Sequence, residues 1–281
     1  MLEKIFNLIK KIKRVFYPFY KDKELKFVFQ KFQEGHPSDK IVARFVGGCV
    51  RKYLSNDEID DIDIATTLSS DEIKERFNNT NFRVVDTGIE HGTITLVSKK
   101  HKLEITTLRK DVETDGRHAE VEYIDDWKLD SERRDFTINA MAIDVARELL
   151  YDPHNGRNDI SRGIIRAVGN AHQRLSEDGL RIMRAYRFAD RRDRGVWELE
   201  NSLEISISQQ KHMLDNISRE RIFIEWKKIL SGQNSSIIIQ KKGLMGILDR
   251  FLIGKGHKFK SQTDTEAVSY THLTLPTNRE V

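Results

Sequence analysis

Short runs rich in β-branched and aromatic residues fill the chain between Ile41 and Val145, and they constrain the fold more than any other feature. In chain order they are IVARFVGG, DIDIATT, FRVVDTG, TITLVS, KLEITTL and TINAMAIDV. Runs such as TITLVS and KLEITTL lie only a few residues apart, which favours antiparallel pairing, and a helix expected between Cys49 and Leu54 adds a crossover. We therefore predict an α+β fold in which a mixed sheet carries helices on one side.

The pattern changes to helical periods after the run LLYDPHNG and stays helical for most of the remaining chain. The predicted helices span residues 171–194, 196–209, 218–230 and, more weakly, 235–252. The segment from Asp111 to Ser131 is acidic, lacks a clear period and is longer than an ordinary connection, so we predict a mobile functional loop there.

The N-terminal residues form a separate pattern, with apolar side chains on one helical face and lysines elsewhere, before Pro18 stops it. This predicts a basic amphipathic helix, which would either dock on its own domain or touch RNA or a membrane surface. We divide the chain into four parts. These are an N-terminal extension (1–34), a head (35–150), a helical region (151–266) and an atypical tail (267–281).

Composition excludes several classes of protein. The 281 residues hold 48 Lys and Arg against 44 Asp and Glu, a net charge of +4, so the chain is not a uniformly basic polyanion binder. The single cysteine, Cys49, allows no internal disulfide, which fits a reducing compartment. No run approaches the roughly 18 apolar residues of a membrane span. We therefore expect a soluble, cytoplasmic protein without stable membrane association.

The strongest local signal for chemistry is the pair Asp61 and Asp63 at the start of a predicted strand. Alternation along a strand points both carboxylates to one side, where they repel each other unless a cation lies between them. Mg²⁺ suits one or two carboxylates together with substrate phosphates. The alternative interpretation is a solvated turn.

A phosphate site is predicted beside these carboxylates. Gly47 and Gly48 remove side chains where a backbone could approach a triphosphate, and Arg51 adds a positive charge. Glu104 lies in a strand between apolar residues and would complete a three-carboxylate cage if it faced the same way. Two metal ions about 4 Å apart could then act on the attacking hydroxyl and the leaving pyrophosphate.

Two later segments carry further candidates. Arg134 could clamp a phosphate, Asp135 could accept a ribose hydroxyl and Asn139 could orient nearby groups; the alternative is a surface salt-bridge cluster. Helical spacing also places Arg181 one turn from Glu177 and Asp178.

A carboxylate beside a guanidinium can read the edge of a base. Asp178 accepting from an exocyclic amine while Arg181 donates to a ring nitrogen would select cytosine and adenine over uracil and guanine. The alternative is an ion pair on an exposed helix. The arginines from Arg181 through Arg184 to Arg194 form a basic run that binds phosphate or is simply a solvated face.

The ordered set of these motifs resembles one known family. The segments are VGGCVRKYL, DDIDIAT, LEITTLR, RRDFTINAMAID, YDPHNG, LSEDGLRIMRAYRFA and ISRERIFIEWKKIL. They resemble the successive motifs of the bacterial class II tRNA nucleotidyltransferases (CCA-adding enzymes) and of the bacterial poly(A) polymerases, over about residues 41–231. The resemblance implies a polymerase-β-like nucleotidyltransferase head with a mixed sheet, followed by an all-α neck.

The resemblance also implies roles for single residues. Asp61 and Asp63 would be metal ligands, with Glu104 as a third acidic residue, and Arg134 and Asp135 would contact the ribose and phosphates. Residues 151–156 would form a hinge.

In the neck, Asp178 and Arg181 would template the incoming base, with Glu177 holding the arginine. Two departures are Lys52, where the family usually has Asp, and Gly179, where proline is common. Family members continue into body and tail regions that grip tRNA, so we expect a C-terminally truncated enzyme.

These observations together predict an enzyme that adds C and A to the 3′ end of tRNA from CTP and ATP, with Mg²⁺. The alternatives are a poly(A) polymerase, an enzyme that adds only CC or only A, and a non-catalytic RNA-binding fragment. In each case the partner is the 3′ end of tRNA or another RNA.

Overall fold

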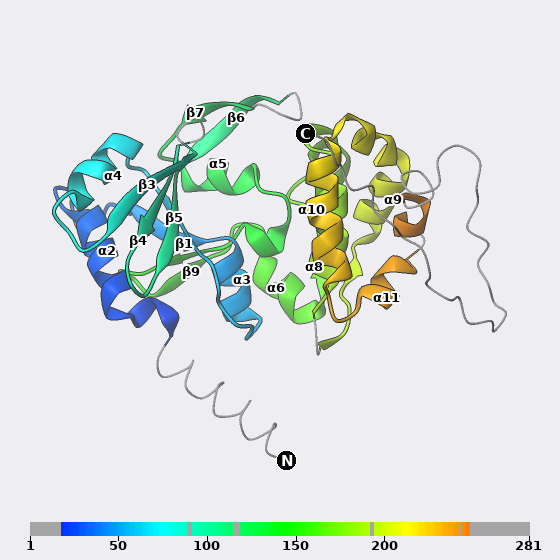
Figure 1. Cartoon of the computed structure of the whole chain (residues 1–281), viewed down its shortest axis with the longest axis horizontal. Coiled ribbons are helices and arrows are strands. Elements are labelled where there is room, and N and C mark those ends of the chain that lie inside the picture. The colour runs from blue at the N-terminus through cyan, green and yellow to red at the C-terminus, as the bar shows by residue number, and fades with distance from the viewer. Residues whose placement is uncertain (1–17, 89–91, 115–118, 192–193, 242, 248–281) are drawn as a thin grey trace, which may run out of the picture.

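A computed structural model gives the fold as a sheet-containing head followed by a helical neck (Figure 1). It describes residues 18–88, 92–114, 119–191, 194–241 and 243–247. The predicted amphipathic helix of residues 1–16 and the predicted tail, residues 267–281, lie outside the described residues. No described helix combines the length and apolar character needed to cross a membrane.

The head is built on one mixed sheet, which has seven strands within the described residues. In spatial order the strands are β3 (Arg83–Gly88), β4 (Thr93–Val97), β5 (Lys102–Thr107), β2 (Ile62–Thr66), β1 (Ala43–Val46), β8 (Ala142–Asp144) and β9 (Leu149–Tyr151). Strands β2 and β5 pair in parallel, and the other neighbours pair antiparallel. The predicted mixed sheet is therefore confirmed.

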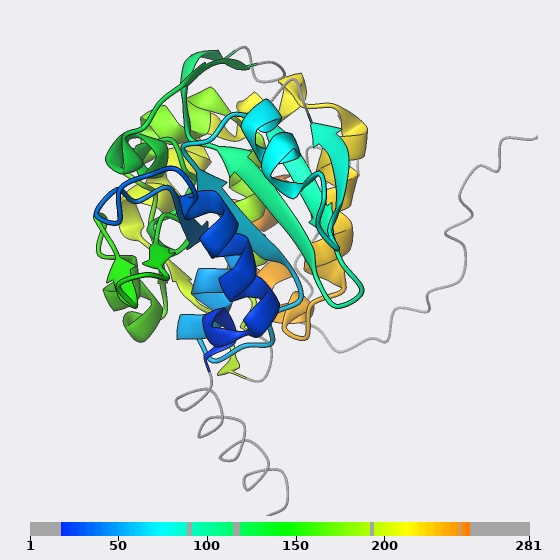
Figure 2. The ribbon, with the colours of Figure 1, turned by 90° about the vertical axis from the view of Figure 1, so that its left-hand side faces the viewer.

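One face of the sheet carries the core of the head. Three helices cover it: α2 (Lys23–Gln33), α3 (Gly48–Leu54) and α4 (Ser70–Phe77). Figure 2 looks onto α2 and α4, in dark blue and cyan, in front of the strands. Phe32 of α2 and Phe45 of β1 are fully buried in this core. Helix α2 thus packs into the head, although it falls within the predicted extension 1–34.

The prediction of a loop from Asp111 to Ser131 is wrong. The chain instead forms an antiparallel ribbon of β6 (Arg109–Thr114) and β7 (Ala119–Tyr123), followed by α5 (Trp127–Glu132). Acidic residues have low intrinsic strand preference, and here the backbone pairing of two adjacent segments overrides it. The run TINAMAIDV likewise becomes a 3₁₀ turn at Thr137–Asn139 before the short strand β8.

The neck contains α6 (Gly156–Arg162), α7 (Ala171–Glu177), α8 (Leu180–Ala189), α9 (Asn201–Gln210), α10 (Arg219–Leu230) and α11 (Ser235–Ile239), with a small pair of strands, β10 (Ile164–Ile165) and β11 (Glu198–Leu199). The single helix predicted for residues 171–194 is broken, because Asp178 adopts an extended backbone (φ −150°, ψ 104°) between α7 and α8. The helix predicted from residue 196 begins at Asn201, after β11.

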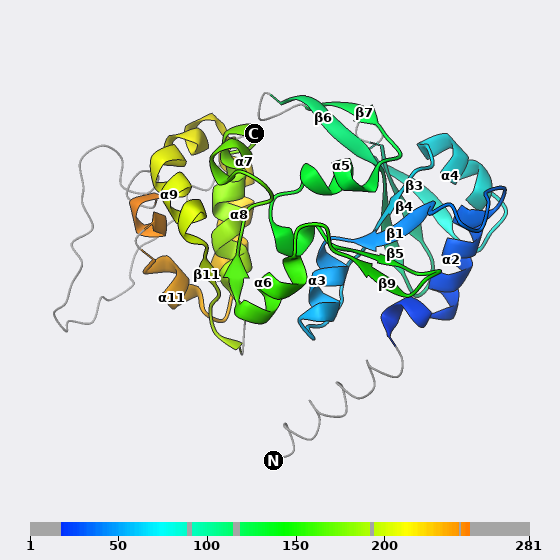
Figure 3. The ribbon, with the colours of Figure 1, turned by 180° about the vertical axis from the view of Figure 1, so that it is seen from behind.

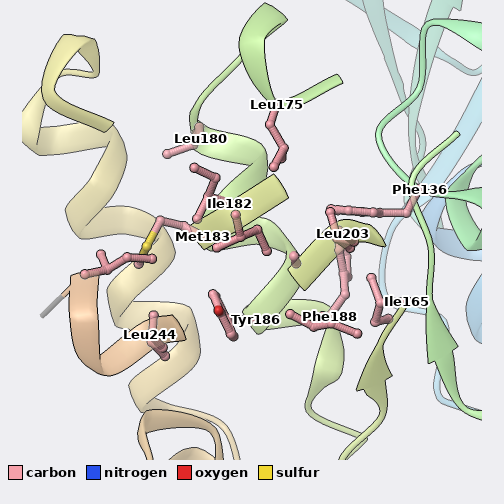
Figure 4. Close-up of a cluster of buried hydrophobic side chains, with 14 of the residues drawn as sticks. Phe136, Ile165, Leu175, Leu180, Ile182, Met183, Tyr186, Phe188, Leu203 and Leu244 are labelled. Atoms are coloured by element: carbon pink, nitrogen blue, oxygen red, sulfur yellow. The ribbon is translucent and has the colours of Figure 1, made fainter. Parts of the chain in front are cut away.

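The head and neck are joined by a shared core. Phe136, which follows α5 in the chain, is 1% exposed and packs with neck residues such as Phe188. Figure 4 shows Phe136 projecting from the head side toward Leu203 and Phe188. Backbone hydrogen bonds from Thr137 to Arg166 and from Val168 to Asp135 close the same junction. The segment through which the chain passes from head to neck is therefore packed against both regions.

Candidate active site

A cleft of about 770 Å³ lies between the head and α8, and of the site residues selected from the sequence all but Glu177 line it. From the head it is lined by Gly47, Gly48, Arg51, Asp61, Asp63, Glu104, Arg134, Asp135 and Asn139. From the neck it is lined by Asp178, Arg181 and Arg184. Figure 3 shows the sheet and α8 on opposite sides of α5 and α3. Residues far apart in the sequence thus share one cleft.

Three carboxylates face the cleft from the sheet. Asp63 of β2 is paired in register with Glu104 of β5, so both side chains leave the same face of the sheet, and Asp61 precedes Asp63 by two residues. Burial raises the pKa of the Asp63 carboxyl, and the negative charges of Glu104 and Asp61 raise it further. The charge of Arg134 acts in the opposite direction but does not cancel this effect, so the site favours a bound cation.

The donor set fits a magnesium ion held partly by substrate. Asp61 and Asp63 offer hard carboxylate oxygens, and Mg²⁺ is commonly bound by one or two carboxylates plus phosphates. Among the described residues, however, no three His, Cys, Asp or Glu side chains are close enough to form a metal site by themselves. The predicted three-carboxylate cage with Glu104 is therefore not present as a closed set.

Gly47 is required by the close approach of its neighbours. It adopts φ +65°, and a Cβ atom there would lie 3.3 Å from Asp63 Oδ2 and 3.5 Å from Arg134 Nη1. Any other residue would be strained by the positive φ, and its Cβ would push on the Asp63 carboxylate while making an ordinary contact with Arg134. Gly48 has no such backbone constraint, and its Cβ would make an ordinary contact with Asp63 at 3.6 Å.

Arg51 lies deep in the cleft. Its guanidinium donates to Asn139 Oδ1 and stacks over the ring of Phe188 at 4.6 Å. Burial, and then the charge of Arg187, lower its pKa to about 10. An anionic ligand in the cleft would therefore stabilise the charged form of the Arg51 guanidinium.

Asp130 is a buried residue beside the cleft that sequence reasoning missed. It is 3% exposed and accepts hydrogen bonds from Arg133 Nη2 at 2.6 Å and from Arg134 Nη2 at 2.9 Å. The sequence pattern that could have identified Asp130 is its position three residues before Arg133 and four before Arg134, because residues at these spacings are neighbours on a helix. Asp130 holds Arg134 beside the carboxylates.

Asp135 is buried in an ion pair. Its Oδ2 accepts from Arg184 Nε at 2.8 Å, and its Oδ1 accepts from Asn139 Nδ2 and Phe136 N at 2.9 and 2.8 Å. Burial alone would raise its pKa, but the charge of Arg184 and these hydrogen bonds hold the pKa at about 2. The surface-cluster alternative is wrong, because Asp135 and Asn139 are 8% and 6% exposed. Asp135 links the head to α8.

The structure agrees with the sequence on the predicted base-reading residues Glu177 and Arg181, but it places Asp178 differently. Arg181 Nη1 donates to Glu177 Oε2 at 2.9 Å, as expected, and Arg181 Nη2 donates to Arg133 O at 3.1 Å. Asp178 is not on the same helical turn, because the chain breaks there. Its Oδ1 accepts from Leu180 N at 3.1 Å, and Arg221 of α10 lies 3.5 Å from its Oδ2.

The exposed-ion-pair alternative for this group is wrong, because the Arg181 side chain is only 12% exposed. Sequence reasoning did not assign Lys52, Lys102, Arg109 and Arg221 to the cleft, although all four line it. Arg187 and Phe188 also line it, and both fall within the basic run that the sequence indicated.

The fold and the cleft are those of a polymerase-β-type nucleotidyltransferase head domain, with acidic side chains on a mixed sheet opposite a helical neck. Residues 43–166 match the poly A polymerase head domain, and residues 198–250 match a probable RNA and SrmB-binding site of polymerase A. The chain belongs to the family of tRNA nucleotidyltransferases and poly(A) polymerases.

Individual relatives agree with this assignment. The chain is 43% identical over 209 residues to the CCA-adding enzyme of Lactococcus lactis, covering 72% of this chain and 50% of the relative. A crystal structure of the Bacillus stearothermophilus CCA-adding enzyme with CTP superposes with a TM-score of 0.69 at 34% identity, covering 81% of this chain and 53% of that one.

A tRNA nucleotidyltransferase complexed with a primer tRNA and an incoming ATP analog has a TM-score of 0.67 at 30% identity, covering 81% of this chain and 63% of that one. The chain spans about half the length of the curated relatives it matches.

Proposed function

We propose that this protein is a template-independent RNA nucleotidyltransferase that adds C and A to the 3′ end of tRNA from CTP and ATP. One observation carries the proposal: Asp61 and Asp63 of the head and Asp178 and Arg181 of the neck line the same cleft, which has a volume of about 770 Å³. One side suits a triphosphate with its metal ions, and the other suits the edge of a base. Relatives whose names and complexes include CCA addition, CTP and tRNA support the same substrates.

In this proposal the carboxylates and arginines prepare the triphosphate. Asp61 and Asp63 would hold Mg²⁺, which supplies Lewis-acid chemistry at the phosphates when bound. Arg51 and Arg134 would neutralise the phosphate oxygens, and Gly47 leaves space beside them. The 3′ hydroxyl of the RNA attacks the α-phosphorus in line, the bond to the β-phosphate oxygen breaks, and pyrophosphate leaves.

The neck would select the base. Asp178 accepts from the exocyclic amine of cytosine or adenine, and Arg181 donates to the neighbouring ring nitrogen. The hydrogen bonds of Arg181 to Glu177 and to Arg133 O set the direction of its remaining N–H groups. Uracil and guanine present a carbonyl beside an N–H, and would leave both side chains unpaired.

The proposed partner is the 3′ end of tRNA. The match of residues 198–250 to an RNA-binding region supports an RNA contact along α9, α10 and α11. We propose the cytoplasm as the place of the reaction, because the single cysteine, Cys49, can form no internal disulfide, as is typical of a reducing compartment.

An incorporation assay tests the proposal. The protein is incubated with tRNA lacking its 3′ terminus, Mg²⁺ and each nucleoside triphosphate singly and together, and the products are sequenced. Ordered CCA ends are expected. Long A tracts would instead identify a poly(A) polymerase, CC or A alone a partial enzyme, and unchanged ends with retained RNA binding a non-catalytic fragment.

A further inference from the structure

A second contact between head and neck lies away from the cleft, where the segment after α8 meets the end of α3. Arg194 Nη1 donates to Ser55 O, and Arg194 Nη2 donates to Asn56 O at 3.0 Å. Beside it, Arg191 Nη2 donates to Asp57 Oδ2 at 2.7 Å. We call these five residues the clasp. It joins two segments that are more than 130 residues apart in the sequence.

The head side of the clasp is the end of a helix. Ser55 caps α3, and Asn56 follows in the left-handed conformation, with φ 58°. Asn56 N donates to Tyr53 O at 3.1 Å and Asp57 N donates to Lys52 O at 2.8 Å, a closed helix end. Such an end leaves its last carbonyls without helical partners and carries partial negative charge. The Arg194 guanidinium satisfies both needs.

The neck side of the clasp is also ordered. The Arg191 guanidinium stacks on the Trp197 ring at 4.1 Å, and Arg191 N donates to Gly195 O at 2.9 Å. Asp190 accepts from Asn234 Nδ2 at 2.9 Å, which ties this turn to the segment before α11. Because Arg191 and its neighbours are fixed within the neck, the clasp holds the end of α3 at a defined place relative to the whole neck.

Close packing does not explain this contact. A cavity of about 450 Å³ lies at the clasp, lined by Ser55, Asn56, Arg191 and Arg194 together with the apolar side chains of Leu54, Ile160 and Trp197. Because this space is not filled by side chains, apolar burial contributes little to the contact at the clasp. At this end of α3 the guanidinium hydrogen bonds are the specific interactions with the neck.

The two helices that meet at the clasp also meet in the cleft. Helix α3 begins at Gly48 beside Asp63 and ends at the clasp, while α8 carries Arg181 and Arg184 in the cleft and ends just before Arg191. Head and neck are also held together at the crossing near Phe136, where Asp135 pairs with Arg184, and in the cleft, where Arg51 of α3 stacks on Phe188. The clasp adds a contact at the other end of α3, and a contact at a distance from the others restricts rotation between the two regions.

We propose that Arg194 and Arg191 are positioning residues that set the angle between head and neck. They thereby set the separation of the metal-binding carboxylates from the base-reading side chains; this consequence for catalysis rests on the proposed function. A planar guanidinium can bond two carbonyls at once, so lysine at position 194 would keep the charge but lose the two-point contact.

The geometric part is tested by spin labels on exposed sites of the two regions, introduced as Glu75→Cys on α4 and Gln209→Cys on α9. The native Cys49 is fully buried and stays unlabelled. In Arg194→Ala and in Arg191→Ala the distribution of label distances should broaden about twofold, as expected when a domain contact is lost. Arg194→Lys should broaden it to an intermediate extent.

The control is Lys241→Gln, which removes an exposed ion pair with Glu198 inside the neck and should leave the distribution unchanged. An unchanged distribution in both arginine variants would overturn the proposal. Thermal unfolding identifies alanine variants that have lost their fold. If an alanine variant does not fold, the test uses Arg194→Lys, which keeps the positive charge.

The catalytic part is tested by kinetics with CTP. For Arg194→Ala, kcat should fall about 10-fold while KM for CTP changes less than about 2-fold, because the base and phosphates still bind but are misaligned. Wild-type kcat in a variant with a broadened distribution would overturn this part. Absence of CTP binding by the wild-type protein would instead refute the proposed function, and the spin-label result would stand independently.

Discussion

The two sides of the cleft differ in how their charges are balanced. On the neck side, Arg181 pairs with Glu177, Arg184 with the buried Asp135, and Arg187 with the buried Glu225 of α10. On the head side, Asp61 and Glu104 are exposed, and within the described part of the chain neither side chain has an ion-pair partner. Asp63 between them has a raised pKa because of burial and these neighbours.

This difference indicates a division of labour. Paired and partly buried groups keep one geometry without a ligand, which suits recognition of a base. Like charges held together are destabilising by themselves and become favourable only when a cation binds, which suits chemistry. The neck is therefore preorganised, whereas the head is completed by its metal and substrate.

The largest expected effect is on the head side. Asp63→Asn should lower incorporation about 10³-fold, because loss of a metal ligand removes several kcal/mol of transition-state stabilisation. It should also raise the temperature of unfolding, because it removes a desolvated carboxylate that repels Glu104 and Asp61. Primer extension and calorimetry measure the two effects.

The control for Asp63→Asn is Asp86→Asn, which removes a surface ion pair with Lys74 on the same sheet. It should change neither activity nor stability appreciably. A joint decrease of activity and unfolding temperature in Asp63→Asn would mean that the carboxylate stabilises the head, and the contrast between the two sides would not hold.

On the neck side the main effect is on stability. Arg184→Gln should lower the free energy of unfolding by about 3–5 kcal/mol, because it leaves the Asp135 carboxylate buried without its counter-charge. Urea unfolding measures the change. Lys74→Gln, an exposed ion-pair partner, should cost no more than about 1 kcal/mol. Equal losses in the two variants would contradict the buried pair.

Selectivity should depend on the shape of one side chain. Arg181→Lys should reduce discrimination of CTP over UTP by about 10²-fold, because lysine cannot keep contact with Glu177 and Arg133 O while donating to a base. Single-turnover rates with each nucleotide measure it. Arg174→Lys, beside Glu177 but outside the cleft lining, is the matched control and should retain selectivity.

The smallest expected effect concerns the turn before α3. Gly47→Ala should lower the free energy of unfolding by about 1–2 kcal/mol through the positive φ, and lower activity about 10-fold by displacing Asp63. Gly35→Ala has a similar φ, +77°, with open space around it. It should show the stability loss without the activity loss, and any shared activity loss would remove the site-specific explanation.

Sequence reasoning located most of the cleft because its signals are local. Strand alternation placed Asp61 and Asp63 on one face, and this required only the period of an extended chain. Glu104 faces the same way because β2 and β5 pair in register, which the sequence alone did not establish. The ribbon of β6 and β7 was missed because acidic residues are poor predictors of strands.

The neck shows the opposite balance. The spacing of Glu177 and Arg181 predicted their ion pair, yet the same spacing wrongly placed Asp178 on a continuous helix. Arg221 reaches Asp178 from 43 positions away in the sequence, so no local pattern signals this contact. The same applies to the clasp between Arg194 and the end of α3.

The sequence by itself determined the change from strands in the head to helices in the neck, the acidic pair on one strand face and the arginines that follow Arg181, because side-chain period and spacing are properties of the local chain. The tertiary structure decided which of these charges are neutralised. Asp135 and Glu225 are buried against arginines from other elements, whereas Asp61 and Glu104 stay open to the cleft. Burial and partner identity depend on packing between distant segments, and only the folded chain brings those segments together.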